Sequence, residues 1–219
     1  MKIDQGNDRL EVHKTSAGTG ILIDLERPKT LKKRMISRGL RVLDLASGSG
    51  APYLILEDLG WSIEKWVSCE LDAETRKVAR GINPTVKSPC HDLLEMAKME
   101  SRGTYDIALA ATPCKGFSGA NDSARGMKGH DGDLIKAAAA IINKARASNP
   151  GLKILMENVK LHPRLKHQAK EQDELIGIPF KEFTASGQGA SQIRTRRVAT
   201  NIVDIDQLRY KDMIDPNVL

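Results

Sequence analysis

The residues best suited to chemistry lie in the stretch Ala110–Ser118, which reads AATPCKGFS. It follows Tyr105–Leu109, an apolar run typical of a β-strand, and Pro113 stops strand pairing because it has no N–H to donate. Cys114 therefore comes just past a strand end, which is where open α/β sheets bind their ligands. A thiol at that place suits nucleophilic catalysis, while this stretch alone also fits a small buried cysteine in a loop.

A second candidate site is the glycine-rich turn Ala46–Ala51, which reads ASGSGA. It joins the short apolar strand expected over Arg41–Leu45 to the apolar helix expected over Tyr53–Leu59. A strand, a glycine-rich turn and a helix together form a cradle for nucleotides, because the backbone can approach a ligand closely where no Cβ intervenes. The same pattern also occurs as a tight turn without a ligand.

Carboxylates follow the next predicted strands. Glu64–Glu70 ends in Glu70, about twenty residues after the glycine turn, where a carboxylate can accept two hydrogen bonds from ribose hydroxyls. Val86–Asp92 is a third predicted strand that ends in Asp92. The remaining expected elements are helices over Asp72–Gly81, Leu93–Met99, Asp133–Ala147 and Leu161–Leu175, and strands over Tyr105–Ala111, Leu152–Met156 and Val198–Ile205. These strand ends predict one ligand-binding edge of a sheet.

Composition narrows the class of protein. The chain has 219 residues, enough for one large domain with a core, and its net charge of +6 is compatible with a polyanion such as DNA or RNA. Its three cysteines are odd in number and have no metal-ligand spacing, so neither a disulfide nor a metal site is predicted. The sequence has no apolar signal core and no membrane-spanning run, so we expect a cytoplasmic chain without membrane contact.

Taken in order, the motifs resemble those of the cytosine-5 DNA methyltransferases that use S-adenosylmethionine. The motifs are Asp44–Gly50 (DLASGSG), Glu70, Asp92, Thr112–Ser118 (TPCKGFS), Glu157–Val159 (ENV) and Gln192–Arg196 (QIRTR). The resemblance covers roughly residues 40–205, and Thr200–Ile202 (TNI) is similar to the phage-type and eukaryotic de novo-type branch. It implies an α/β, Rossmann-like class I methyltransferase fold, with a mostly parallel central sheet flanked by helices.

The resemblance also implies roles. Cys114 would add to C6 of a flipped cytosine, Glu157 would hold the N3 and amine edge, and Arg194 and Arg196 would address the base and a phosphate or the cysteine loop. The implied cofactor-binding residues are Asp44, Ala46, Ser47, Gly48, Ser49, Gly50, Ala51, Glu70, Leu71, Asp92, Leu93, Thr112 and Pro113. The glycine turn would lie beside the methionine portion, with Glu70 at the ribose and Asp92 and Leu93 at the adenine. The implied substrate-binding residues are Lys115, Ser118, Asn158 and Gln192.

Three departures from the family pattern stand out. Ala46 replaces the aromatic residue that usually packs on adenine, and Lys115 replaces the usual Gln or Asn after the cysteine. The usual target-recognition region after the Gln-x-Arg-x-Arg motif is missing, which leaves open a second subunit, relaxed specificity, or a permuted equivalent in Thr15–Leu25. We predict an N-terminal extension over residues 1–39, a catalytic domain over 40–205 and a tail over 206–219.

These features predict a DNA (cytosine-5)-methyltransferase that uses S-adenosylmethionine and acts on double-stranded DNA in a bacterial or phage-infected cell, as in restriction–modification. The loop Gly116–Gly132 would close over the flipped base. Two alternatives stay open: an RNA (tRNA) cytosine-5 methyltransferase, and a non-catalytic DNA-binding or regulatory subunit that needs a partner.

Overall fold

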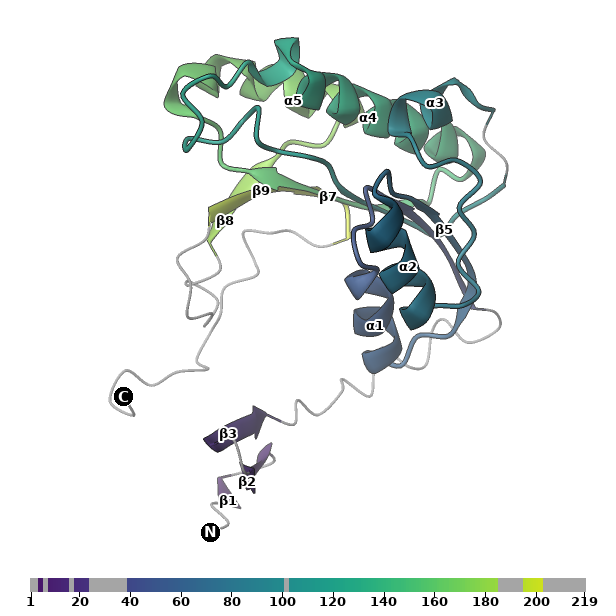
Figure 1. The fold of residues 1–219 in the computed structure, drawn as a ribbon, viewed down its shortest axis with the longest axis vertical. Helices are drawn as coiled ribbons and strands as arrows, with labels where there is room; N and C mark the ends of the chain where they lie inside the picture. The colour runs from purple at the N-terminus through teal and green to yellow at the C-terminus, as the bar shows by residue number, and fades with distance from the viewer. Residues whose placement is uncertain are drawn as a thin grey trace. The chain divides into compact units, whose positions relative to one another are not determined.

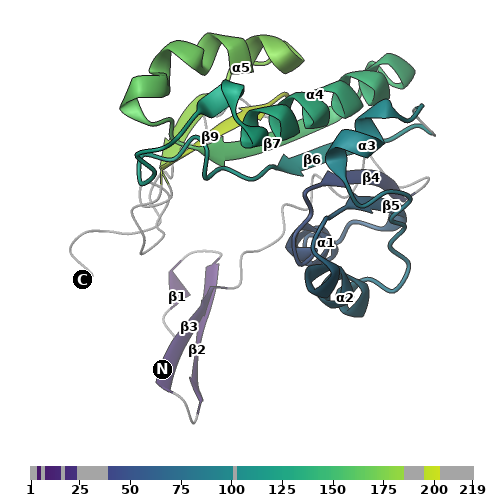
Figure 2. The ribbon, with the colours of Figure 1, turned by 45° about the horizontal axis from the view of Figure 1, so that its top comes forward.

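The computed structural model describes residues 4–5, 8–15, 18–23, 39–100, 103–184 and 195–202. The chain divides into two compact units, Met1–Arg38 and Gly39–Leu219. The first contains three antiparallel strands, which can be followed in Figure 2: β1 (Asp4–Gln5), β2 (Asp8–Thr15) and β3 (Gly18–Ile23).

The second unit is built on a six-stranded sheet with the strand order β5-β4-β6-β7-β9-β8. The strands are β4 (Leu40–Leu45), β5 (Ile63–Cys69), β6 (Ile107–Ala111), β7 (Lys153–Val159), β8 (Lys181–Thr184) and β9 (Thr195–Thr200). Strands β5, β4, β6 and β7 are parallel, and β9 is antiparallel to β7 and to β8. The connections reverse direction between β4 and β6, and ligands bind such sheets outside the carboxyl ends of the strands at that switch point.

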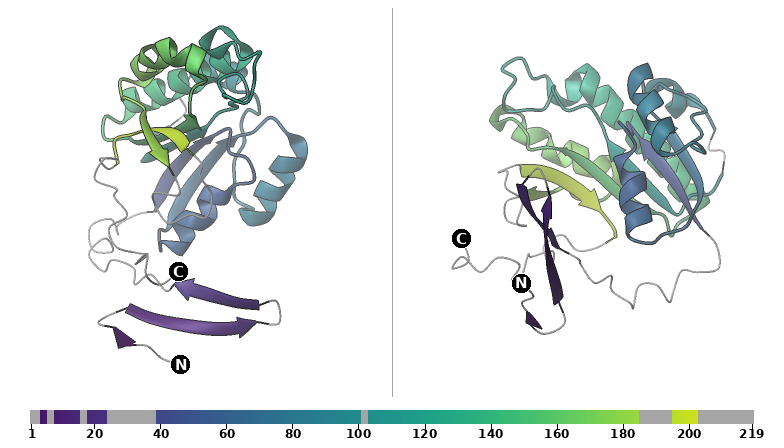
Figure 3. Two further views of the ribbon diagram at one scale, coloured as in Figure 1. Left: turned by 90° about the vertical axis from the view of Figure 1, so that its left-hand side faces the viewer. Right: turned by 60° about the horizontal axis from the view of Figure 1, so that its bottom comes forward.

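Helices cover the sheet on both faces (Figures 1 and 3). One face carries α3 (Leu93–Lys98), α4 (His130–Ser148) and α5 (Ala169–Ile176), and the other carries α1 (Ala51–Asp58) and α2 (Ala73–Ile82) near β4 and β5. Because side chains alternate along a strand, Leu43 and Leu45 enter the core below α4, whereas Val42 packs with Trp66 on the opposite face. The rings of Trp66 and Tyr53 meet edge to face, with centroids 5.3 Å apart.

The predicted strand over Val86–Asp92 is wrong. Only Lys87 bridges to β5: its N–H donates to the carbonyl of Trp66 (2.9 Å) and its carbonyl accepts from the N–H of Ser68 (2.9 Å). Pro89 follows two residues later and has no N–H to continue the ladder. The chain then turns, and Asp92 caps α3 by accepting from the backbone N–H of Leu94 (2.7 Å).

The other predicted helices and strands differ from the observed ones mainly in where they begin and end. Helix α4 begins at His130 rather than Asp133, and the predicted helix over Leu161–Leu175 is two pieces, the 3-10 helix η3 (Pro163–Gln168) and α5. Strand β8 was not predicted because its four residues carry no apolar alternation. Within the described ranges, no helix combines the length and apolar content that crossing a membrane requires. Among the described side chains, no group of three or more His, Cys, Asp or Glu could hold a metal ion.

Candidate active site

The turn between β4 and α1 has a backbone shape that few sequences could adopt. Ala46, Gly48 and Gly50 all lie in the left-handed region, with φ of 53°, 56° and 83°. A Cβ on Gly50 would meet the Cβ of Ala79 at 3.4 Å, so this glycine lets the turn pack against α2. A Cβ on Gly48 would meet nothing within 4 Å, so this part of the backbone faces open space where a ligand could approach.

Glu70 fixes the turn to the end of the neighbouring strand β5. One carboxylate oxygen accepts from the N–H of Gly48 (2.9 Å) and the other from the N–H of Asp72 (3.0 Å). Asp72 in turn caps α2 by accepting from the N–H of Thr75 (2.7 Å). The carboxylate predicted at this strand end therefore lies directly beside the glycine turn.

Two buried polar atoms at this turn have no hydrogen-bond partner. They are Oδ2 of Asp44, whose side chain is 3% exposed, and Oγ of Ser47, which is 8% exposed. Burial raises the pKa of Asp44 to about 7, the charge of Glu70 adds to this rise, and a hydrogen bond from Trp66 opposes it. Since buried polar atoms in proteins are normally paired, two unpartnered ones beside an open backbone fit a turn that holds a polar ligand.

The loop that carries Cys114 follows β6 and is held from two sides. The carbonyl of Cys114 accepts from the N–H of Phe117 (3.0 Å), and the Phe117 side chain is completely buried. The N–H of Gly116 donates to Oδ2 of Asp131 in the first turn of α4 (2.6 Å). The Phe117 carbonyl accepts from the N–H of His162, beyond the end of β7 (2.7 Å). These contacts fix the loop around a half-exposed cysteine.

The segment that follows this loop is anchored as well. Met127, in the 3-10 helix η2 (Gly126–Lys128), is buried, and its N–H donates to the side-chain oxygen of Gln168 (2.7 Å). Gly126 has φ of 58°, and a Cβ there would lie 2.0 Å from that same oxygen. The expectation that Gly116–Gly132 forms one closing loop is therefore wrong for its second half, which is packed against the protein.

Strand β7 brings the predicted Glu-Asn-Val motif to the same edge. Glu157 lies opposite Ala111 in the parallel register of β6 and β7, and Cys114 follows Ala111 by three residues. Asn158 points to the other face, is completely buried, and donates from Nδ2 to Oγ1 of Thr112 (3.2 Å). This contact ties the end of β7 to the start of the cysteine loop.

Glu157 is ion-paired rather than buried. Its Oε1 lies 2.6 Å from Nε of Arg196 on β9, and the two side chains are 33% and 21% exposed. Arg197, the next residue, faces the opposite side, where it pairs with Asp173 of α5 (3.2 Å) and stacks over Phe180. Of the two adjacent arginines, Arg196 belongs to the candidate site and Arg197 to the core.

A cavity of about 400 Å³ opens beside these groups. Its lining includes Ser118 of the cysteine loop, Arg196 of β9, and two lysines, Lys160 and Lys166. Lys160 also pairs with Glu182 of β8 (3.0 Å). The hollow between Ser118 and Arg196 therefore has a basic wall.

A family model for C-5 cytosine-specific DNA methylases matches residues 40–187, which is more than half of the chain. The chain belongs to this family. The match includes the glycine turn, the cysteine loop and the Glu-Asn-Val strand of this family member, and so confirms the resemblance drawn from its motifs.

One solved structure supports the fold of this family member. A predicted DNA modification methyltransferase encoded within a prophage of Escherichia coli aligns with a TM-score of 0.56 at 20% sequence identity, over 81% of this chain and 52% of that one. The chain thus spans about half the length of that protein. A predicted RNA methyltransferase of Pyrococcus horikoshii gives a TM-score of 0.45 at 15% identity, over 74% of each chain. The Rossmann-like class I methyltransferase fold expected from the sequence is confirmed.

The structure places the predicted site residues of this family member at different locations. Those at the carboxyl edge of the sheet are Asp44, Ala46, Ser47, Gly48, Ser49, Gly50, Ala51, Glu70, Leu71, Thr112, Pro113, Cys114, Lys115, Ser118, Glu157, Asn158 and Arg196. Asp92 and Leu93 were expected near the adenine. In the structure Asp92 caps α3 and the Leu93 side chain is buried in the main core, so both residues also have a structural role. Gln192 and Arg194 lie outside the described residues.

Some residues that shape the site carried no signal in the sequence. Asp131 and Gln168 hold the cysteine loop and the segment after it, through contacts that span 15 and 41 residues of sequence. Lys160 and Lys166 line the cavity. Only the position of Lys160, directly after the Glu-Asn-Val motif, could have drawn attention to one of them.

Proposed function

We propose that this chain transfers a methyl group from S-adenosylmethionine to C5 of cytosine in double-stranded DNA, with Cys114 as the nucleophile. The observation that carries the proposal is the register of β6 and β7, since it brings the Cys114 loop and the Glu157–Arg196 pair to one sheet edge. The glycine turn after β4 lies at the same edge, because β4 is the neighbour of β6 in the sheet. A nucleophile, an acid–base group and a cofactor turn then adjoin one another.

The residues of the turn fit the cofactor. Asp44 and Ser47 have buried polar atoms without partners, Gly48 faces open space, and Glu70 holds the turn in place. A cationic ligand group near Asp44 would offset the cost of burying its carboxylate, which is otherwise seen in its raised pKa. When bound, S-adenosylmethionine supplies an electrophilic methyl group on a sulfonium sulfur.

Cys114 would activate the base. Carbon 5 of cytosine is not nucleophilic, but addition of the Cys114 thiolate to C6 would make the C5 position enamine-like, so that it could take the methyl group while the sulfonium leaves as a neutral thioether. Transfer of the proton from C5 to water would then expel the thiolate, which breaks the bond from sulfur to C6 and restores the aromatic ring. The contacts of Gly116 with Asp131 and of Phe117 with His162 would keep Sγ oriented through these two steps.

Glu157 would bind the Watson–Crick edge of the cytosine. A carboxyl group there can donate to N3 and accept from the exocyclic amine, and a proton on N3 stabilises the ring as Cys114 adds to it. The ion pair with Arg196 would orient the Glu157 carboxyl group toward the base.

The basic wall of the cavity suits DNA. Lys160 and Lys166 could contact phosphates next to the flipped nucleotide, and such contacts supply affinity without reading sequence. The target cytosine must leave the helix to reach Cys114, as bases do in enzymes that modify them. Restriction–modification is one setting for such an activity.

The test is methyl transfer by the purified chain. Labelled S-adenosylmethionine is incubated with mixed-sequence duplex DNA or with tRNA, and Cys114→Ala and Cys90→Ala are run beside the natural chain. We expect label in DNA, its loss in Cys114→Ala and its retention in Cys90→Ala. Label in tRNA alone would replace DNA by RNA as the substrate. Cofactor binding without transfer to either nucleic acid would overturn the proposal and favour a regulatory subunit that needs a partner.

A further inference from the structure

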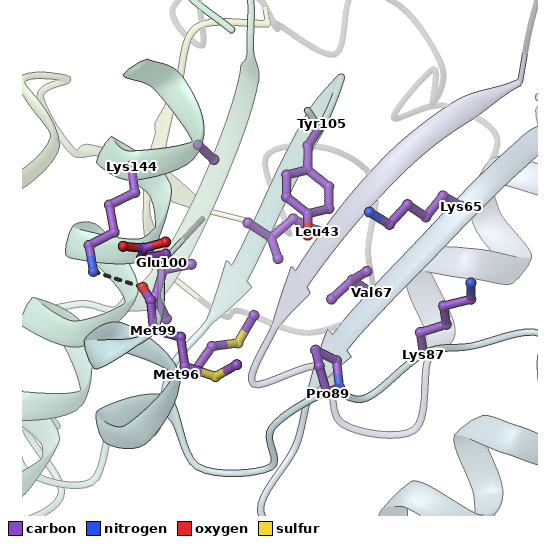
Figure 4. A pocket seen from close by; sticks show the side chains of 12 residues that line it. Leu43, Lys65, Val67, Lys87, Pro89, Met96, Met99, Glu100, Tyr105 and Lys144 are labelled. Carbon is purple, nitrogen blue, oxygen red and sulfur yellow. Dashed lines mark hydrogen bonds between the residues drawn. The ribbon is translucent and has the colours of Figure 1, made fainter. Parts of the chain in front are cut away.

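A second cavity lies away from the candidate active site. It has a volume of about 250 Å³ and lies between the sheet, α3 and α4 (Figure 4). Its floor is Leu43 of β4 and Val67 of β5, and its walls include Tyr105 and Ile141. None of the described residues assigned above to the cofactor, the cytosine or the DNA lines it.

The hollow lies where the sheet has no further described strand beyond β5. The segment after α2 pairs with β5 only through the bridge of Lys87 to Val67 and then turns at Pro89, so no described strand continues along this outer edge of β5. Met96 and Met99, in and just after α3, stand over the uncovered floor. Methionine side chains are flexible and polarizable, which makes them adaptable walls for an apolar ligand.

The charges at this cavity are mostly positive. The described part of its lining carries three lysines, Lys65, Lys87 and Lys144, against one carboxylate, Glu100. Nζ of Lys65 lies 5.0 Å from the centre of the Tyr105 ring, and Figure 4 shows it reaching toward that ring. Nζ of Lys87 points away from the two methionines in the same view.

Lys144 holds the end of α3 through hydrogen bonds to backbone carbonyls. Its Nζ donates to the carbonyls of Ala97 (2.6 Å) and Met99 (3.0 Å), which close the end of α3. It therefore fixes one wall of the cavity. Lys65 lies two residues before Val67 on β5 and on the same face of that strand, so it is the cation placed beside the apolar floor.

We propose that this cavity binds a small amphipathic carboxylate, with its apolar body against Val67 and Met96 and its carboxylate at Lys65. The volume suits a body of roughly ten to fifteen non-hydrogen atoms, below the size of most drug-like ligands. The apolar floor supplies affinity by burial, and the excess of positive charge selects an anion over a neutral molecule of the same shape. The site is independent of the proposed methyl transfer.

The probe is 2-naphthoate, compared with the uncharged 2-naphthamide of the same shape. The full chain carries seven methionines, so labelling their methyl groups with 13C gives a simple NMR spectrum in which Met96 and Met99 report on the cavity. We expect 2-naphthoate to shift these two signals and leave that of Met156, buried in the main core, in place. The amide should bind about tenfold more weakly.

Two lysine variants test which positive charge binds the carboxylate of the ligand. Lys65→Gln should weaken naphthoate binding about tenfold, whereas the matched control Lys87→Gln should change it by less than about twofold. Ala145→Leu places extra side-chain volume at the lining and should abolish binding. If that variant fails to fold, Lys65→Gln still decides the outcome.

Three results would overturn the proposal. They are an absence of shifts at Met96 and Met99 up to about 5 mM naphthoate, equal affinity for the acid and the amide, and equal weakening by Lys65→Gln and Lys87→Gln. None of these measurements depends on methyl transfer, so failure here and failure of the proposed function are distinguished.

Discussion

Replacing Asp44 by Asn should stabilise the protein in the absence of cofactor, and more so at high pH. Burial raises the pKa of the Asp44 carboxyl from the ordinary 3.8 to about 7, so the folded protein keeps a proton that the unfolded chain has lost. The folded state is therefore favoured below pH 4, and its stability falls as pH rises through 7. Asn keeps an acceptor for the hydrogen bond from Trp66 but has no charge to bury.

The size of the effect follows from the two pKa values. The carboxyl costs the folded state about 2 kcal/mol at pH 5 and about 4 kcal/mol at pH 8, because each unit of difference is worth about 1.4 kcal/mol. The stability gap between Asp44→Asn and the natural chain should thus widen by about 2 to 3 kcal/mol over this interval. Cofactor binding by the variant should weaken at the same time, because the turn loses its buried charge.

The assay is urea unfolding without cofactor, followed by circular dichroism at pH 5 and at pH 8. Asp58→Asn, on the exposed end of α1, is the matched control for the loss of one carboxylate. A gap that stays constant between the two pH values would show that the pKa of Asp44 is not raised, because Asp44 would then be ionised in the folded state over the whole interval.

Three further predictions follow from the loop contacts and the thiols. Gly126→Ala should cost about 2 kcal/mol or more in unfolding free energy, because its φ is positive and its Cβ would displace the Gln168 side chain. Asp131→Ala should lower kcat about tenfold with little change in cofactor affinity, because the N–H of Gly116 loses its charged acceptor. Cys69 should resist iodoacetamide at pH 8 until the protein is unfolded, as mass spectrometry can follow, because burial raises its pKa to about 12.

Each of these three predictions has a control in the same chain. Gly119→Ala should leave stability unchanged, since a Cβ there meets nothing within 4 Å. Asp133→Ala removes an exposed carboxylate from the same turn of α4 and should leave kcat unchanged. Cys114 is half-exposed and should react with the reagent in the folded protein. Equal effects of a variant and its control would show that the named contact is not the cause.

The strands that form the ligand-binding edge could be predicted because each is a short apolar run that ends in a distinctive residue. Arg41–Leu45 leads into glycines and Glu64–Glu70 ends in a carboxylate, and both lie within a residue or two of the strands found. The strand over Val86–Asp92 failed because Pro89 ends pairing after one bridge. The apolar pattern of this stretch predicted a strand even though Pro89 has no N–H for strand pairing.

The contacts that hold the cysteine loop could not be predicted, because they join residues far apart in sequence through single side chains. Nothing in the spacing of Asp131 or Gln168 marks them as partners of a backbone N–H. The motif at Thr200 and Asn201 has a structural basis that the sequence did not indicate: Oγ1 of Thr200 donates to the carbonyl of Ile154 (2.6 Å), and Oδ1 of Asn201 accepts from its N–H (2.7 Å). These two side chains extend the pairing of β9 with β7 beyond the strand end.

The most direct test of the central claim is to trap the bond between Cys114 and the base. Duplex DNA containing 5-fluorocytosine is incubated with the chain and S-adenosylmethionine, since fluorine on C5 prevents the proton loss that releases the thiolate. We expect a complex that survives denaturation, with the modified nucleotide attached to the peptide that contains Cys114, and no complex with Cys114→Ala. Methyl transfer to ordinary DNA without any trapped complex, or attachment at another residue, would contradict it.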